Sequence, residues 1–253
     1  MNPQPYPGPP LGGEPTAPPQ RVVDHFVPYA TYVLIAANLL VFAISGSRGG
    51  FGDTDFDVLR QLGMLFSPDV WDGQIWRLVS AQFLHGGLMH IGFNMYVLYS
   101  IGPELERIYR APRFLLVYLG AGWMGSLSSL IWSGASVGAS GAIFGLAGAF
   151  LAISLRKRSY FDAFGSQMLF FIGINLAIGF AGFFNIDNFG HMGGLVGGFI
   201  LGNIVPNRLP EFKATPARWI ATGVAVVAFA ALTPFAVQLS QQVALSRAAS
   251  QTP

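Results

Sequence analysis

Residues 138–155 read GASGAIFGLAGAFLAISL, and this stretch decides the fold. Apart from two serines it holds only apolar residues and glycine, and it is about as long as a helix that crosses the hydrocarbon core of a bilayer. Its glycines at 141, 145 and 148 recur at a spacing that puts them on one side of a helix. Small residues on one side let helix backbones approach closely in lipid. The stretch therefore predicts a membrane-spanning helix that packs tightly against another.

The composition of the whole chain also indicates a membrane protein. Hydrophobic residues make up 52% of the 253 residues and charged residues only 10%, whereas a soluble domain carries about 25% charge. The net charge is +2, but the basic residues are scattered over connecting segments, so we expect no nucleic-acid partner. The chain has no cysteine, which excludes disulfides, thiol catalysis and cysteine-ligated zinc.

Further apolar runs of similar length predict an all-α polytopic membrane protein with seven spans. The runs lie near residues 28–45, 86–103, 112–133, 138–155, 165–183, 189–205 and 218–237. Residues 1–27, rich in proline and glycine, should form a disordered tail. Residues 28–205 should then form a six-span core, and residues 206–253 a loop, a seventh span and a short outer tail.

The basic residues orient the predicted bundle, because cationic loops tend to remain in the cytoplasm. With the N-terminus inside, ten of the 14 lysines and arginines fall on the inner side and four on the outer side. We therefore expect a cytoplasmic N-terminus and an outer C-terminus, in a bacterial cell membrane. In this orientation the second, fourth and sixth spans all begin at the outer surface.

Four polar residues lie at the starts of these three spans. His90 and Asn94 are in the first turns of the second span, Ser140 is in the first turn of the fourth, and His191 is in the first turn of the sixth. Polar side chains in lipid are costly unless a function retains them. A serine near an imidazole suggests a nucleophile with its base. His191 also shares a helix face with three glycines, so this face is suited to close contact with a second helix.

His90 and Asn94 are four residues apart and point the same way from their helix. An imidazole and an amide aimed at one point make good donors to a developing oxyanion. Backbone N–H groups at the start of the fourth span, near Ser140, have no partner within the helix and could join them. We interpret His85 as a structural capping or interfacial histidine.

Other hydrolase motifs fit poorly. Residues 50–53 match the G-x-G-D pattern of intramembrane aspartyl proteases, but they lie in a polar loop and no predicted span supplies a second aspartate. No H-E-x-x-H motif occurs, and the histidines have no carboxylate near them in the spans, so we expect no metal and no cofactor. Asp187, four residues before His191, could complete a triad. We expect it to be an exposed acid of the outer loop, which favours a dyad.

Together these residues resemble the rhomboid family of intramembrane serine proteases, over roughly residues 28–205. The motifs are Trp76-Arg77, His85 followed by His90-x-x-x-Asn94, Gly138-Ala139-Ser140-Gly141 and His191-x-x-Gly194-x-x-x-Gly198. The resemblance implies a six-helix core, with Ser140 as nucleophile and His191 as general base. It also implies an oxyanion hole made by His90, Asn94 and the Ser140 amide.

The resemblance further implies substrates that are single-span transmembrane proteins in the bilayer, cut near their outer ends after a small side chain. We expect Gly138 and Phe144 to contact the substrate. Gly190 and Phe144 depart from the family pattern, where alanine and tyrosine are frequent. Phenylalanine can still pack against an imidazole but cannot donate a hydrogen bond. The fifth span and residues 183–187 look suited to a movable lid and lateral gate.

Two functions outside proteolysis are kept as alternatives. One is a catalytically inactive rhomboid-like protein that binds membrane helices, although such a protein would normally have lost the serine or the histidine. The other is a channel or transporter, which the clustering of polar residues near one surface and the lack of a visible inverted repeat disfavour.

Overall fold

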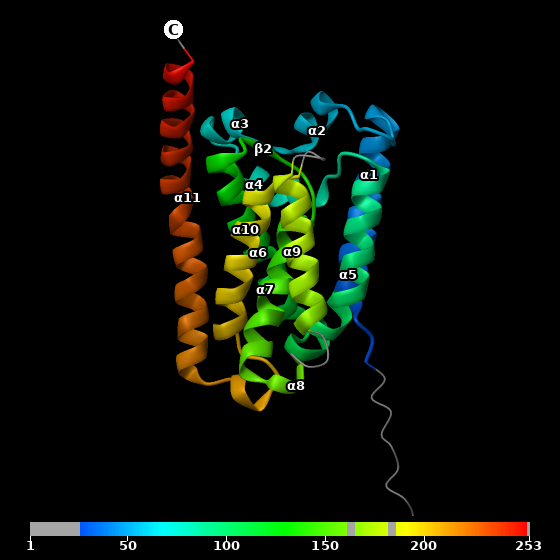
Figure 1. Ribbon diagram of the computed structural model, residues 1–253, viewed down its shortest axis with the longest axis vertical. Helices are drawn as coiled ribbons and strands as arrows, with labels where there is room; N and C mark the ends of the chain where they lie inside the picture. Colours follow the sequence, from blue (N-terminus) through cyan, green and yellow to red (C-terminus); the bar gives the residue numbers. More distant parts are fainter. Residues whose placement is uncertain (1–25, 161–164, 182–185, 252–253) are drawn as a thin grey trace, which may run out of the picture.

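The computed structural model describes residues 26–160, 165–181 and 186–251, which form a bundle of long helices (Figure 1). In chain order the elements are α1 (Tyr29–Gly49), α2 (Phe56–Leu62), β1 (Leu65–Phe66), α3 (Ser67–Trp71), α4 (Arg77–Ser80), η1 (Ala81–Phe83), α5 (Leu88–Tyr109), α6 (Ala111–Trp132), β2 (Ala135–Ser136), α7 (Ser140–Arg156), α8 (Arg158–Tyr160), α9 (Ser166–Phe180), α10 (Asn188–Ile204), η3 (Pro210–Phe212) and α11 (Pro216–Ser250). The all-α polytopic architecture predicted from the sequence is confirmed. The predicted disordered tail lies outside the described residues, apart from its last two positions.

Each predicted span coincides with one helix, namely α1, α5, α6, α7, α9, α10 and α11. Helices α1, α6 and α11 are long and apolar enough to cross a membrane by themselves, and α7 and α9 are shorter apolar helices. Several predicted ends are wrong. Helix α5 continues to Tyr109 and α11 continues to Ser250, because a helix extends through polar residues as long as its backbone hydrogen bonds close, whereas hydropathy registers only its apolar part.

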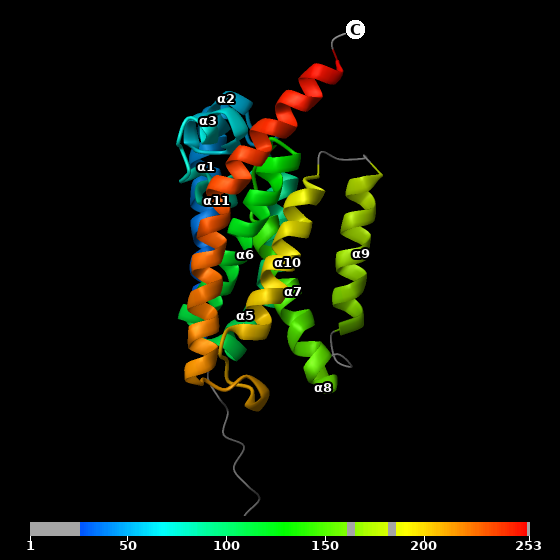
Figure 2. The same cartoon turned by 90° about the vertical axis from the view of Figure 1, so that its left-hand side faces the viewer.

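Helix α11 is much longer than the predicted seventh span. Its 35 residues extend about 52 Å at a rise of about 1.5 Å per residue, and its C-terminal end rises beyond the rest of the bundle (Figures 1 and 2). Two tryptophan indoles bind it to the bundle: Trp71 donates to the Ser240 hydroxyl at 2.8 Å and Trp123 to the Thr233 hydroxyl at 3.3 Å. Arg247 near its end donates to the Trp132 carbonyl at 3.2 Å. The seventh helix is therefore docked along α6 and α3.

Helices α7 and α10 meet through glycines on both sides. A Cβ atom built on Gly194 would lie 3.2 Å from the Gly141 Cα, and one built on Gly198 would lie 2.5 Å from the Gly145 Cα. The close-contact face predicted for the sixth span is thus confirmed. This approach brings the starts of α7 and α10, which carry Ser140 and His191, to the same end of the bundle (Figure 1).

The segment between α1 and α5 supports the entry into α7. Strand β1 pairs with β2 in an antiparallel ladder, with Leu65 opposite Ser136 and Phe66 opposite Ala135. Two residues past β2, the Gly138 N–H donates to the Ala81 carbonyl at 2.9 Å. The chain is thus held in place immediately before α7 begins. The position of Ser140 is therefore fixed both by α7 and by the residues that precede it.

Asp69 organises this surface segment together with two arginines. Its carboxylate accepts hydrogen bonds from Arg60 at 2.9 and 2.7 Å, and the Arg77 guanidinium lies 3.2 Å away. The hydrogen bond from Arg60 lowers the pKa of the Asp69 carboxyl below its usual value. Arg77 is buried and also donates to the Met64 carbonyl at 2.9 Å. The arginine of the Trp76-Arg77 motif therefore crosslinks the segment that supports the site.

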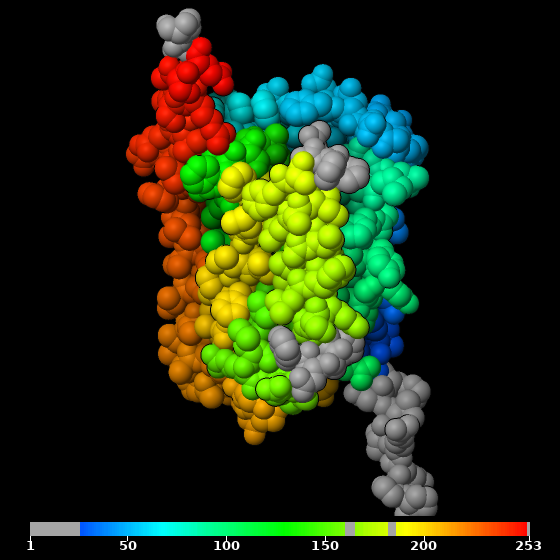
Figure 3. All heavy atoms as spheres, in the orientation of Figure 1, coloured from blue at the N-terminus to red at the C-terminus, as the bar shows by residue number. Residues whose placement is uncertain are grey.

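Helix α9 covers one face of the bundle (Figure 3) and contacts α10 and α7. It packs less closely than the other predicted spans, since only Met168 and Ile172 among its residues are buried. The ring of Phe171 lies 5.5 Å from that of Phe144 on α7. Of the predicted lid, residues 183–185 lie outside the described residues.

Candidate active site

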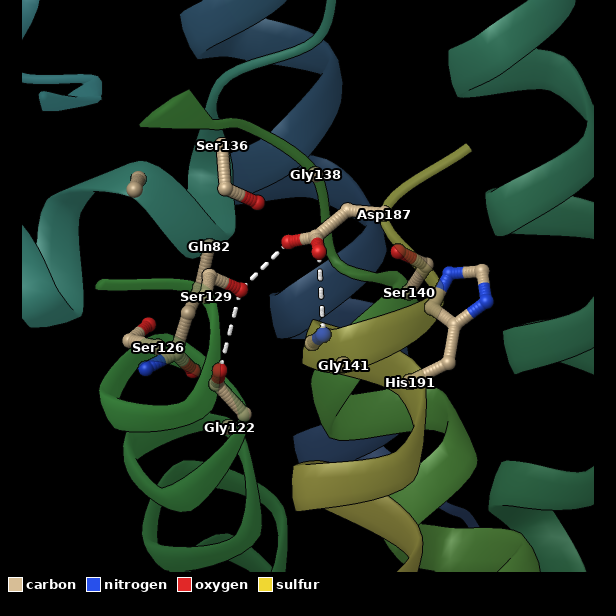
Figure 4. Close-up of a pocket in the computed structure, with 13 residues that line it drawn as sticks. Gln82, Gly122, Ser126, Ser129, Ser136, Gly138, Ser140, Gly141, Asp187 and His191 are labelled. Carbon is tan, nitrogen blue, oxygen red and sulfur yellow. Dashed lines mark hydrogen bonds between the residues drawn. The ribbon is translucent and has the colours of Figure 1, made fainter. Parts of the chain in front are cut away.

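Ser140 and His191 line one pocket, into which Gly138 and Asp187 also face (Figure 4). Ser140 is the first residue of α7, and His191 lies in the first turn of α10. The cavity has a volume of about 20 Å³, which is room for about one water molecule. The two side chains lie beside each other in Figure 4, although no hydrogen bond joins them in the part of the chain that the structure describes. Such bonds often form only in the substrate complex.

The His191 imidazole is held by stacking. It is buried and lies on the Phe144 ring, with centroids 4.2 Å apart and planes inclined by 9°. Its Nδ1 atom is buried and has no hydrogen-bond partner among the described residues. The predicted packing of Phe144 against the imidazole is confirmed. The orientation of the ring therefore depends on Phe144 and on the backbone of α10.

The expectation that Asp187 is an exposed loop acid is wrong. Asp187 is partly buried and caps α10, its Oδ1 accepting the Gly190 N–H at 3.0 Å. The same carboxylate accepts the Ser129 hydroxyl (Figure 4) and, at 2.5 Å, the Ser133 hydroxyl. An aspartate just before an apolar helix is a typical N-cap signal, which the sequence analysis overlooked. These three bonds direct the carboxylate toward α6 and the first turn of α10.

His90 lies against the backbone that leads into Ser140. Gly138 has a φ of +124°, in the region that favours glycine, and a Cβ built there would lie 2.7 Å from the His90 Nε2 and 3.7 Å from the Ser140 Oγ. Glycine at 138 is therefore required both by conformation and by the imidazole beside it. The predicted proximity of His90 to the serine is consistent with this geometry.

Asn94 is buried, and its Nδ2 donates to the His90 carbonyl of the same helix at 2.9 Å. Neither His90 nor Asn94 is among the residues that line the pocket of Ser140 and His191. The structure thus brings the serine, His191 and Gly138 together directly, while His90 of α5 approaches from the side of Gly138.

His85 is fully buried, so the interfacial interpretation is wrong and only a structural role remains. Its Nε2 accepts the Ala139 N–H at 3.5 Å, and its ring meets that of His90 edge-on at 5.1 Å. Burial lowers the pKa of His85 to about 3, with a smaller contribution from His90. A neutral imidazole can accept this hydrogen bond, so His85 links His90 to the residue before Ser140. This link could not be predicted from the sequence, because it joins residues far apart in the chain.

Fold and site together define an integral multi-pass membrane protein in which a serine and a histidine from neighbouring helices face one pocket. The model of the Rhomboid domain matches residues 72–208, more than half of the chain, and the chain therefore belongs to the rhomboid family. The fold is thus of the intramembrane protease type.

Curated relatives agree with this assignment. The chain is similar to the rhomboid protease GluP of Bacillus subtilis (strain 168), with 43% identity over 174 residues that cover 68% of this chain and 34% of GluP. It is 41% identical over 150 residues to RHOMBOID-like protein 1 of Arabidopsis thaliana, covering 57% of this chain and 38% of the relative. With RHOMBOID-like protein 5 of the same plant it shares 36% identity over 172 residues, 65% of this chain and 55% of the relative. The matched region therefore spans between about a third and about half of these relatives.

Proposed function

We propose that this protein is an intramembrane serine endopeptidase that cleaves single-span transmembrane proteins with a Ser140–His191 dyad. The observation that carries the proposal is the meeting of these two side chains in one pocket at the starts of α7 and α10. The bonding of Asp187 to α6 and the lack of a described partner for the His191 Nδ1 favour a dyad over a triad.

In the first half of the reaction, neutral His191 accepts the Ser140 proton as the hydroxyl oxygen attacks the scissile carbonyl. The resulting imidazolium then protonates the leaving amine, which yields an acyl-enzyme. In the second half, His191 takes a proton from water as the water attacks the ester and returns it to Ser140. The pocket supports this step, since polar side chains such as Gln82 and Ser126 line it.

The oxyanion is stabilised by donors from two helices. The Ser140 amide lies at the start of α7, where backbone N–H groups have no partner within the helix. Asn94 uses one N–H of its amide in binding the His90 carbonyl, and the second N–H of the amide group remains for the oxyanion. The His90 imidazole beside Gly138 supplies the third donor.

The substrate must expose a peptide bond that a membrane helix normally shields. We infer substrates with helix-weakening glycine or proline near their outer ends, and a small residue before the cut. Gly138 and Phe144 would contact the substrate beside the nucleophile. The sparse burial of α9 supports a role for this helix as a lateral gate.

We also propose that the end of the bundle carrying Ser140 faces outward, with the N-terminus cytoplasmic and the C-terminus outside, in a bacterial cell membrane. Support comes from the arginines at the opposite end, where α5, α7 and α11 have Arg107, Arg156 and Arg218 in their terminal turns. Such clusters favour the cytoplasmic side.

A fluorophosphonate probe, which phosphonylates activated serines with loss of fluoride, tests the proposed nucleophile. The full chain in detergent should be labelled, Ser140→Ala should not be labelled, and His191→Ala should be labelled far more slowly. Ser154→Ala is the matched control, because Ser154 is a buried serine on the same helix, and it should be labelled like the wild type. Labelling that persists in Ser140→Ala would exclude Ser140 as the nucleophile. A folded wild type that is not labelled would favour the inactive rhomboid-like alternative.

A further inference from the structure

The carboxylate of Asp187 joins two helices at a point one turn before His191. It accepts the Gly190 N–H of α10 and the hydroxyls of Ser129 and Ser133, which lie one turn apart near the C-terminal end of α6. Hydrogen bonds to an ionised acceptor are stronger than those between neutral groups, and the N-terminal end of α10 favours a negative charge there. The Asp187 carboxylate thus joins α6 to α10 beside the pocket through three hydrogen bonds.

The contact between Asp187 and Ser129 leaves no room for a side chain at Gly190. A Cβ built on residue 190 would lie 2.5 Å from the Asp187 Oδ2 and 2.6 Å from the Ser129 Oγ. The alanine that is frequent at this position would therefore collide with both partners. Gly190 and the bond between Asp187 and Ser129 consequently belong to one arrangement.

Backbone packing also holds the first turn of α10, since a Cβ built on Gly125 of α6 would lie 2.8 Å from the Gly190 carbonyl oxygen. The His191 side chain has its stacking on Phe144 but no described hydrogen bond at Nδ1. Its backbone N–H donates to the Asp187 carbonyl at 3.0 Å, so a shift of Asp187 would move the backbone of His191 with it. On the outer side of the same junction, Trp132 stacks on Phe189 at 5.7 Å.

We propose that Asp187, Ser129 and Ser133 form an interhelical clamp that holds the first turn of α10 against α6 and thereby keeps His191 aligned with Ser140. Asp187 is then a positioning residue and takes no part in proton transfer. The proposal rests on the proposed function, because its consequence for catalysis requires the dyad. The clamp itself can be measured without activity.

The test compares Asp187→Ala, Asp187→Asn and the double variant Ser129→Ala/Ser133→Ala in the full chain in one detergent. Ser128→Ala, a serine next to Ser129 and outside the clamp, is the matched control. Hydrogen–deuterium exchange over residues 187–194 reports the clamp. The rate of fluorophosphonate labelling reports the alignment of the two side chains, and so do kcat and KM on one transmembrane substrate.

We expect faster exchange in Asp187→Ala and in the serine double variant. The rate of fluorophosphonate labelling and kcat should fall by about 10- to 100-fold, since a misplacement of about 1 Å can cost about 100-fold, while KM changes less than about threefold. Asp187→Asn keeps the Oδ1 acceptor of the Gly190 N–H and the Ser133 hydroxyl but replaces the Oδ2 acceptor of Ser129 with an NH2 donor, so its loss should be intermediate. Ser128→Ala should match the wild type in every readout.

Gly190→Ala provides an independent check through a mutant cycle. In the wild-type background it should lower the labelling rate strongly, whereas in the Asp187→Ala/Ser129→Ala background the new methyl group has room and should add little. Equal effects of Gly190→Ala in both backgrounds would overturn the proposal. A wild-type labelling rate in an Asp187→Ala variant with faster exchange would also overturn it. An unlabelled wild type would instead refute the proposed function, and the exchange data would still show whether the clamp exists.

Discussion

Gly198 of α10 lies directly against the backbone of Gly145 of α7, so closely that a Cβ on residue 198 would sit 2.5 Å from the Gly145 Cα. A backbone neighbour cannot rotate away as a side chain can. Any residue larger than glycine at 198 must therefore separate the two helices that carry Ser140 and His191.

Gly198→Ala should accordingly destabilise the protein by about 1–3 kcal/mol, the usual cost of overpacking. Thermal unfolding in a single detergent measures this. Gly223→Ala is the control, because a Cβ built on Gly223 of α11 meets nothing within 4 Å, and it should be neutral or slightly stabilising. Equal melting temperatures for the two variants would show that α7 and α10 are not in such close contact.

Asn94→Ala should lower turnover by about 10- to 1,000-fold with a smaller effect on KM, because an oxyanion donor acts mainly in the transition state. Steady-state kinetics on a transmembrane substrate gives both constants. Asn203→Ala is the matched control: Asn203 makes the same bond to the carbonyl four residues earlier, at 2.9 Å, toward the far end of α10. If both variants lost turnover equally, Asn94 would have only a helix-stabilising role.

The stability of the protein should depend on pH through His85. Its pKa is about 3 in the folded protein and about 6.5 in an unfolded chain. Between these values the unfolded state binds more protons, so this contribution to stability is complete above about pH 6.5 and is lost progressively as the pH falls. The difference in melting temperature between the wild type and His85→Gln should therefore shrink from pH 7 to pH 4. Parallel curves for the two proteins would contradict a buried, neutral His85.

Reporter fusions test the proposed orientation. Fusions after Lys157 and after Lys213 should report the cytoplasm, and a fusion after Gly134, between α6 and β2, should report the outer side. A reporter at Lys157 that faces outward would reverse the bundle and place Ser140 at the cytoplasmic surface.

The sequence was sufficient to predict those helices that carry a signal within one stretch of residues, either an apolar run long enough to span a membrane or a regular spacing of glycines. Residues 138–155 predicted α7, and the glycine ladder after His191 predicted the contact with α7. Strands β1 and β2 were not predicted, because two-residue strands have no detectable period. The far end of α11 was missed because its polar residues continue a helix that hydropathy cannot register.

In the candidate site, the placement of Ser140 and His191 at helix starts could be predicted because it depends only on where spans begin. The environment of Asp187 could not, since its serine partners are 54 and 58 residues away in the sequence. The burial of His85 likewise depends on a contact with Ala139, 54 residues later. The sequence showed that Gly190 departs from the family pattern. Only the structure explains this glycine, because the atoms of Asp187 and Ser129 leave no room for a side chain at residue 190.

Cleavage of a single-span transmembrane substrate reconstituted in vesicles tests the dyad most directly. The wild type and Ser154→Ala should cut the substrate near its outer end at equal rates, Ser140→Ala should give no product, and His191→Ala should give almost none. All variants would be matched for thermal stability beforehand. Cleavage by Ser140→Ala at the wild-type rate would contradict the assignment of a serine protease dyad to this protein.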